Sequence, residues 1–167
     1  MSLPPEPRAV ICNSGPLIAL AGVGQLELLQ RLFGQVLVPA AVVREVTEAG
    51  AGRIGAKEIA GLTWLEQRVV DPPPDRLLAE ELGAGEAEVI TLALRVRPRE
   101  VLLDERRARR IAEVAYHLPV RGTAGLLVAA KRARLIPLVR PLMNAMRDNG
   151  YYLSQRLLDA ACTEVGE

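Results

Sequence analysis

Short apolar runs that alternate with helix-forming stretches are the feature that most narrows the fold of this chain. Four runs read as buried strands: "AVIC" (9–12), "QVLV" (35–38), "EVLL" (100–103) and "LPV" (118–120). A helix-forming stretch follows each run, and this alternation is typical of βαβ units with a parallel sheet. The segment "TWLEQRVV" (63–70) is a candidate fifth strand, at a sheet edge, before the breaker "DPPPD" (71–75). The pattern predicts an α/β fold around a central parallel sheet of four to five strands.

The pattern changes near residue 136. Of the 167 residues, 1–136 carry the alternating strands and helices, and the length suits one compact domain. Two short helices follow, one from Pro137 to about Arg147 and one that begins after the N-cap Ser154. We therefore predict that residues 137–167 form a C-terminal helical hairpin packed on the same domain.

Cysteine use and hydropathy indicate the compartment. Cys12 and Cys162 lie at opposite ends of the chain without a CxxC spacing, which argues against a disulfide framework or a zinc site. No apolar run approaches the roughly 20 residues that a membrane span needs, and the polar start does not resemble a signal peptide. We expect a cytoplasmic protein that has no contact with a membrane.

The distribution of arginine is more informative than the net charge of +1. Only two of the 21 basic residues are lysines, and arginines crowd the segments 95–110 and 121–140. The planar guanidinium suits phosphate, so these segments are candidates for nucleic-acid binding. Alternatively, a gene rich in G and C places arginine on any solvated helix face.

Two motifs carry little weight. "GAGRIGAK" (50–57) matches G-x-G-x-x-G, but a helix-like segment precedes it where a dinucleotide-binding fingerprint needs a strand. A helix–helix connection is the better interpretation. His117 is the only histidine and has no partner at a catalytic spacing, so a structural role is the default.

Polar residues follow the predicted strands at the edge where parallel sheets collect function. Asn13 and Ser14 come directly after the first strand, and Asp104 follows "EVLL". Gly122 and Thr123 follow "LPV" and open a helix whose N-terminus is suited to phosphate. These residues are expected to lie close together.

Two glutamates on helices complete the candidate site. Glu86 lies in the first turn of the apolar helix 82–96, on the face of Val89, Ile90 and Ala93, which should be buried. Its neighbour Glu88 points elsewhere and is expected to be solvated. Glu45 lies on the helix after "QVLV".

Glu45, Glu86 and Asp104 are expected to converge. Crowded carboxylates need a cation, and oxygen ligands suit Mg²⁺ or Mn²⁺, which activate water for phosphodiester hydrolysis. Simpler roles exist for two of them. Glu45 is an ordinary surface acid in one interpretation, and Asp104 is the N-cap of the helix "ERRARRIAEVA" in another.

Together these segments resemble a PIN domain, the fold of VapC-type toxin ribonucleases, and more narrowly a subgroup whose first motif reads close to "SNTSPLI". The matching pieces are "CNSGPLIALAGVGQLELL" (12–29), "VLVPAAVVREV" (36–46), "LGAGEAEVITLAL" (82–94), "VLLDERRARRIAE" (101–113) and "LPVRGTAGLLVAAKRARLI" (118–136). The tail fits the same subgroup. The resemblance implies a three-layer α/β/α fold, an acidic site for Mg²⁺ or Mn²⁺, cleavage of single-stranded RNA, a homodimer and a cognate antitoxin.

Position by position, the family's four acidic positions fall on Asn13, Glu45, Glu86 and Asp104. Its supporting hydroxyls fall on Ser14 and Thr123. Asparagine thus stands where most PIN domains have a carboxylate, and Gly15 replaces the usual serine.

Two functional hypotheses follow. The first is a divalent-metal-dependent ribonuclease in which Glu45, Glu86 and Asp104 hold the metal, with Asn13 as a neutral ligand. In this hypothesis the phosphates of the RNA bind to arginines of the segment 97–110, namely Arg97, Arg106, Arg107 and Arg110. The second is a PIN domain that has lost strong metal binding and binds RNA or a protein. An unrelated α/β phosphotransferase that uses Asp104 is a third interpretation, without a recognisable nucleotide loop.

Overall fold

The computed structural model describes residues 8–48 and 55–167 as one sheet flanked by helices. The elements, in chain order, are β1 (Val10–Cys12), α1 (Ser14–Gly22), α2 (Glu27–Phe33), β2 (Val36–Pro39), α3 (Ala40–Thr47), α4 (Ala56–Ala60), β3 (Leu65–Arg68), α5 (Arg76–Glu81), α6 (Ala84–Val96), β4 (Glu100–Leu102), α7 (Arg106–Arg110), the π-helical turn η1 (Ile111–Ala115), β5 (Val120–Arg121), α8 (Thr123–Arg132), α9 (Arg140–Asp148) and α10 (Gln155–Glu164).

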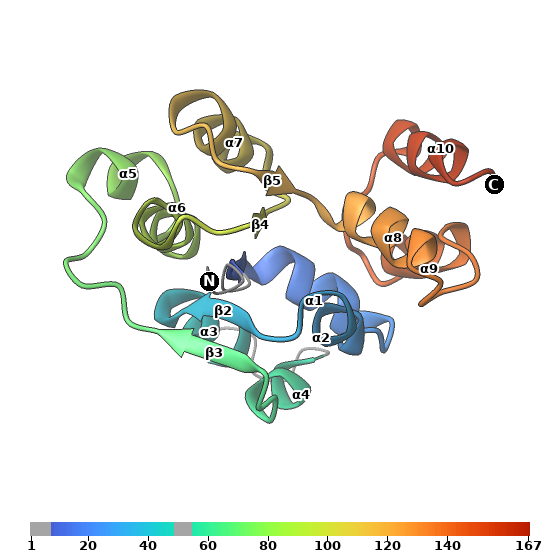
Figure 1. Ribbon diagram of the computed structural model, residues 1–167, viewed down its shortest axis with the longest axis horizontal. Coiled ribbons are helices and arrows are strands. Elements are labelled where there is room, and N and C mark those ends of the chain that lie inside the picture. Colours follow the sequence, from blue (N-terminus) through green and yellow to red (C-terminus); the bar gives the residue numbers. More distant parts are fainter. Residues whose placement is uncertain (1–7, 49–54) are drawn as a thin grey trace, which may run out of the picture.

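The sheet confirms the predicted α/β class. Its five strands are all parallel, in the order β3-β2-β1-β4-β5, so the fifth strand predicted at 63–70 lies at an edge. Figure 1 shows α5 and α6 on one side of the sheet and α1, α2 and the C-terminal helices α8 to α10 on the other. The arrangement is a three-layer α/β/α fold, as the resemblance implied.

The central strands are buried because helices cover both faces. Every residue of β1, β2 and β4 is buried, and Ile11, Leu102 and Leu103 are almost completely inaccessible. Most of the core is aliphatic. Such a core needs no disulfide, and both cysteines are free and buried.

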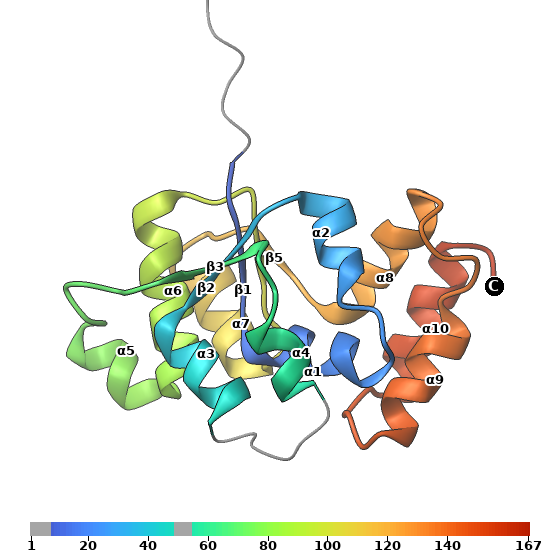
Figure 2. The same cartoon turned by 90° about the horizontal axis from the view of Figure 1, so that it is seen from below.

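The C-terminal hairpin joins this core. Figure 2 shows α8, α9 and α10 side by side at one end of the molecule, with α1 next to them. Met143 and Met146 of α9 are fully buried in the same hydrophobic cluster as β1 and β4. The first helix of the hairpin begins at Arg140, later than the predicted Pro137.

Several local features differ from the sequence expectations. The helix α5 was not predicted; it begins after Asp75, whose Oδ1 accepts a hydrogen bond from the Leu78 N–H at 2.9 Å. The motif at 50–57 lies mostly outside the described residues, and α4 begins at Ala56, in the last two residues of the motif. Within the part of the chain that is described, no helix has the length and apolarity to cross a membrane.

Glu167 stabilises the start of α9. Its carboxylate accepts hydrogen bonds from the Lys131 ammonium at 2.6 Å, the Val139 N–H at 2.7 Å and the Arg140 N–H at 2.9 Å. Burial alone would raise the pKa of Glu167, but these three donors outweigh it and lower the pKa to about 2. The charged carboxylate is therefore favoured in the folded state.

This lowered pKa predicts an acid-dependent contribution to stability. An unfolded glutamate has a pKa of about 4.3, so the contribution is complete above that pH and is lost as the pH falls toward about 2. Glu167→Gln should therefore lower the free energy of unfolding at pH 6 and have a smaller effect at pH 3, as measured by urea denaturation. Glu164→Gln is the control, because Glu164 makes only an exposed ion pair with Arg132. Equal losses for Glu167→Gln at both pH values would contradict the assignment.

Candidate active site

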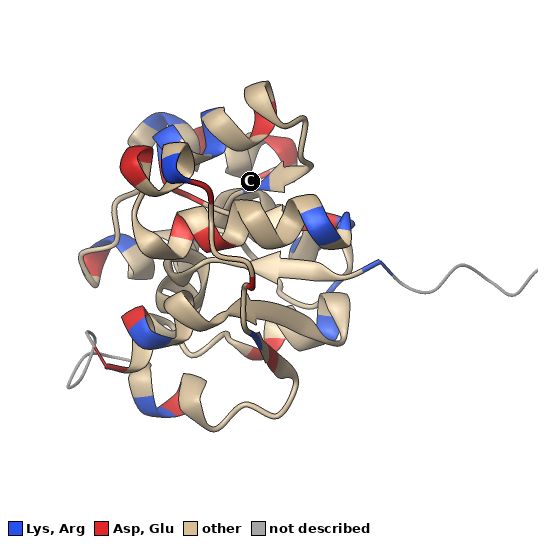
Figure 3. Ribbon diagram, turned by 90° about the vertical axis from the view of Figure 1, so that its left-hand side faces the viewer, with Lys and Arg blue, Asp and Glu red and all other residues tan. Residues whose placement is uncertain are grey.

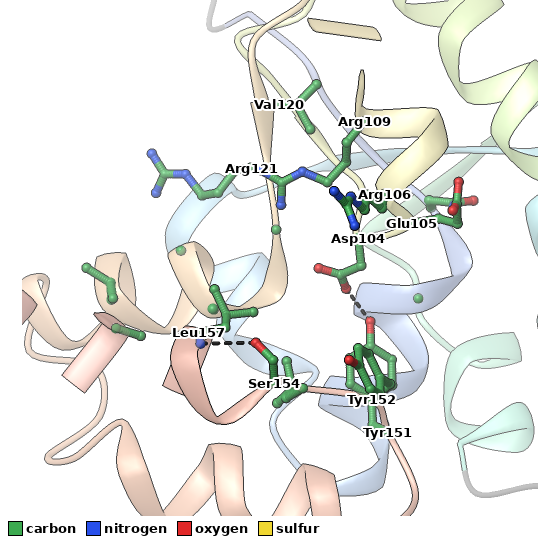
Figure 4. A pocket seen from close by; sticks show the side chains of 18 of the residues that line it. Asp104, Glu105, Arg106, Arg109, Val120, Arg121, Tyr151, Tyr152, Ser154 and Leu157 are labelled. Atoms are coloured by element: carbon green, nitrogen blue, oxygen red, sulfur yellow. Dashed lines mark hydrogen bonds between the residues drawn. The ribbon is translucent and has the colours of Figure 1, made fainter. Parts of the chain in front are cut away.

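A cavity of about 770 Å³ opens at the carboxyl ends of β1, β4 and β5. Asn13 follows β1, Asp104 lies two residues after β4, and Gly122 follows β5. All of them line the cavity, together with Glu86 from α6 and residues of the C-terminal extension. Figure 4 shows Asp104 with Arg106 and Arg109 on one side of it and Tyr151 and Tyr152 on the other.

Asp104 is held by hydrogen bonds from three donors. Its Oδ1 accepts from the Thr123 N–H at 2.7 Å, and its Oδ2 accepts from the Thr123 hydroxyl at 2.6 Å and from the Tyr151 phenol. A carboxylate has about four acceptor positions, so one remains for a further donor or a cation. Asp104 is not the N-cap of α7: Glu105 takes that role and accepts from the Arg107 and Ala108 N–H groups.

Tyr151 is a part of this site that the sequence did not reveal. Its ring comes from the segment between α9 and α10, and its phenol reaches Asp104 because Gly15 leaves space. A Cβ at position 15 would lie 3.1 Å from the phenol oxygen. Burial, and to a smaller extent the charge of Asp104, raises the pKa of Tyr151 far above its ordinary value. The phenol therefore keeps its proton and donates a hydrogen bond to Asp104. No spacing in the sequence links residue 151 to residue 104.

Asn13 presents an unsatisfied oxygen. The residue is only 3% exposed, and its backbone N–H donates to the Leu102 carbonyl at 2.9 Å. Its Oδ1 has no hydrogen-bond partner among the described residues. A buried polar atom without a partner is costly, and it marks a place where a donor or a cation would bind. Asn13 lines the same cavity as Asp104.

The glutamates Glu45 and Glu88 connect α3 with α6. The Glu45 Oε1 accepts from the Gly85 N–H in the first turn of α6 at 2.9 Å. A Cβ at position 85 would lie 2.6 Å from that oxygen, so only glycine allows this approach. In return, the Glu88 Oε2 accepts from the Ala41 N–H in the first turn of α3 at 2.9 Å. Glu88 is therefore only partly solvated, because one of its oxygens is engaged by α3, and Glu45 is more than a surface acid.

Glu86 lies in the first turn of α6. Val89, Ile90 and Ala93 are buried as predicted, whereas Glu86 itself is partly exposed and lines the cavity. Figure 3 shows Asp and Glu at several places along the ribbon, so acidity alone does not single out the site. Glu86 shares the cavity with Asp104 and Asn13, and, unlike Glu105 and Glu164, which also line it, its side chain forms no hydrogen bond or ion pair among the described residues.

The predicted ligands are thus gathered only in part. Asn13, Glu86 and Asp104 line one cavity, Ser14 lines it beside them, and Glu45 is turned toward the N-terminus of α6. Over residues 8–48 and 55–167, no three His, Cys, Asp or Glu side chains lie close enough together to hold a metal ion. The side-chain groups of Asn13, Glu86 and Asp104 that could bind a metal nevertheless all offer oxygen. The Asn13 oxygen has no hydrogen-bond partner among the described residues. This set fits a hard divalent cation.

The arginines are also distributed differently from the prediction. Of the four predicted for RNA binding, Arg97, Arg106, Arg107 and Arg110, only Arg106 lines the cavity. Arg107 forms an ion pair with Glu81, and Arg97 ends α6 in a left-handed conformation with φ of 49°. Two further cavity residues, Arg109 and Arg121, were within the arginine-rich segments but were not singled out.

Comparison with known proteins gave one match. A family model described as a PIN domain matches residues 9–167. No curated protein and no solved structure matches the chain.

The free energy of unfolding reports how much the Tyr151–Asp104 hydrogen bond contributes to stability. Tyr151→Phe removes one donor from a partly buried carboxylate and should lower the free energy of unfolding by about 1.5–3 kcal/mol, the usual range for hydrogen bonds to charged groups. Tyr152→Phe is the matched control, because Tyr152 is 89% exposed and should change stability little. Urea unfolding of both variants makes the comparison. Equal stabilities would show that the phenol contributes nothing to holding Asp104.

Proposed function

The chain belongs to the PIN-domain family, whose members are in general nucleases that use divalent metal ions, and we propose that it is a metal-dependent ribonuclease of the VapC toxin type. The substrate in this proposal is single-stranded RNA, and the ion is Mg²⁺ or Mn²⁺. The observation that carries it is the buried, unpartnered Oδ1 of Asn13, a residue that lines the same cavity as Asp104 and Glu86.

In this proposal Asp104, Asn13 and Glu86 hold the cation. A bound divalent ion activates water and stabilises the charge that develops on the phosphate. Asp104 offers the acceptor position that Thr123 and Tyr151 leave free, and these two residues fix its orientation. Asn13 contributes a neutral oxygen, so the three ligands carry the charge of two carboxylates, those of Asp104 and Glu86.

Glu45 contributes to the site indirectly, by holding the start of α6. Its hydrogen bond to the Gly85 N–H fixes the first turn of α6, which carries Glu86. Direct coordination by Glu45 would require its carboxylate to leave that N–H group. Its part in the reaction is therefore to position Glu86.

Arg106 and Arg109 would bind the RNA phosphates. Both line the cavity beside Asp104, and guanidinium groups form paired hydrogen bonds with phosphate oxygens. A cognate antitoxin and a homodimer belong to the same proposal, since toxins of this type commonly have both.

A second candidate function is favoured by one observation. Because residue 13 is an amide and no three acidic side chains are gathered among the described residues, metal binding by this chain would be weak. A PIN domain of this kind binds RNA or a protein without cutting RNA. Calorimetric titration with Mn²⁺ separates the two functions: a dissociation constant far above physiological metal levels favours the binding module.

The nuclease function is tested by cleavage of a single-stranded RNA in the presence of Mn²⁺. Asp104→Asn and Glu86→Gln should reduce the rate by at least about 100-fold, because each removes a charge next to the cation. Glu45→Gln keeps an oxygen that accepts from the Gly85 N–H and should retain much more activity. Unchanged cleavage in the Asp104 and Glu86 variants would indicate a contaminating nuclease. Complete loss in Glu45→Gln would make Glu45 a direct ligand.

The role of Asn13 has its own test. Asn13→Asp adds a charge to a buried oxygen ligand and should tighten Mn²⁺ binding by about tenfold or more in calorimetry. Ser14→Ala, at the neighbouring cavity residue, is the control and should change the Mn²⁺ affinity much less. If Asn13→Asp leaves the affinity unchanged, residue 13 does not face the ion.

A further inference from the structure

The cavity continues beyond its acidic residues along the C-terminal extension. There it is lined by apolar groups, among them Leu157 and Ala161 of α10 and Val128 of α8. Tyr152 also lines the cavity. The metal site proposed above uses none of these residues, so this part of the cavity is available for another portion of a bound molecule.

Tyr152 is exposed but fixed in position. Its side chain is 89% accessible, whereas the residues on either side are anchored. The Tyr151 phenol donates to Asp104, and its N–H donates to the Met146 carbonyl at 3.0 Å. Leu153 is buried, and the Ser154 hydroxyl caps α10. A single exposed aromatic ring is ordinary on a protein surface. Tyr152 differs from such rings because its backbone is held in place on both sides and because it lines a cavity.

Two arginines that line the same cavity as Tyr152 are available for an anion. Arg106 forms no ion pair among the described residues, and Arg109 makes only a long one to Glu113, at 3.5 Å. Two acids of the cavity wall are already engaged: Glu105 caps α7, and Glu164 pairs with Arg132 at 2.8 Å. Figure 4 shows both arginines near Asp104, on the opposite side from Tyr152.

We propose that this part of the cavity is a nucleobase subsite in which one unpaired base of an RNA stacks on Tyr152 while Arg106 and Arg109 bind the adjoining phosphate. The inference deepens the proposed ribonuclease function and rests on it for the choice of RNA. Bases in a duplex are stacked on both faces, so the subsite accepts single-stranded RNA. Stacking on an aromatic ring is tolerant of sequence, so the subsite selects strandedness and not a particular base.

Binding measured without cleavage tests the subsite. The wild-type chain in EDTA is titrated into a fluorescent single-stranded RNA oligomer and into an oligomer of the same length without bases, and anisotropy gives the dissociation constants. Tyr152→Leu should weaken binding of the base-containing oligomer by about fivefold or more, the lower end of measured stacking contributions, and leave the abasic oligomer unaffected. Tyr152→Phe keeps the ring and should stay within about twofold of wild type.

Two further variants separate charge from stacking. Arg106→Gln should weaken both oligomers to the same extent, because it removes a phosphate contact. Val69→Ser changes another exposed apolar side chain, 79% accessible and outside the cavity, and should change neither. Melting temperatures of all variants confirm that the exposed substitutions leave the fold intact.

The outcomes distinguish the subsite from the nuclease function. Three results overturn the subsite: unchanged RNA affinity in Tyr152→Leu, an equal loss of affinity for both oligomers, or no RNA binding by the wild-type chain. If the affinity is unchanged, the Tyr152 ring is left for a protein partner to cover. The subsite is also overturned if the wild-type chain and Tyr152→Leu cleave RNA at the same rate with Mn²⁺. That result would support the nuclease function. Tyr152-dependent binding without any cleavage supports the subsite and rejects the nuclease function.

Discussion

The register between β1 and β4 is the constraint on which the site depends. The two parallel strands pair Cys12 with Leu102, and the Asn13 N–H donates to the Leu102 carbonyl at 2.9 Å. Both strands are buried on both faces, so the apolar residues on each side fix this alignment. The first polar residues after the two strands then emerge at one edge. The pairing of Leu102 with Arg121 of β5 adds Gly122 and Thr123 next to them.

A neutral residue at position 13 suits this geometry. Asn13 is 3% exposed and emerges from the strand next to the one that leads to Asp104, so an aspartate there would place a buried negative charge near the partly buried carboxylate of Asp104. Neighbouring carboxylates oppose each other's ionisation unless a cation lies between them. With an amide, the folded state does not need the ion, at the expense of one unsatisfied oxygen. The same choice weakens the attraction for a cation.

The sequence predicted the parts of the site that depend on strand periodicity. Asn13 and Asp104 directly follow apolar runs, and the parallel topology then places them together without further information. The contacts of helical side chains were less predictable: Glu86 and Glu88 are two residues apart, and the packing of α3 on α6 determined that Glu88 would reach the Ala41 N–H. The Asp104–Tyr151 contact spans 47 residues and follows no periodic pattern.

The C-terminal extension is attached to the carboxyl-end edge of the sheet by more than apolar packing. Tyr151 donates to the carboxylate of Asp104, which is also held by Thr123 at the start of α8. Glu167 joins Lys131 at the end of α8 to the start of α9. The extension is therefore attached to both ends of α8, and a displacement of α8 would move Thr123 and Tyr151 together. Because both groups bind the same carboxylate, the orientation of Asp104 depends on the packing of residues that follow it by almost 50 positions.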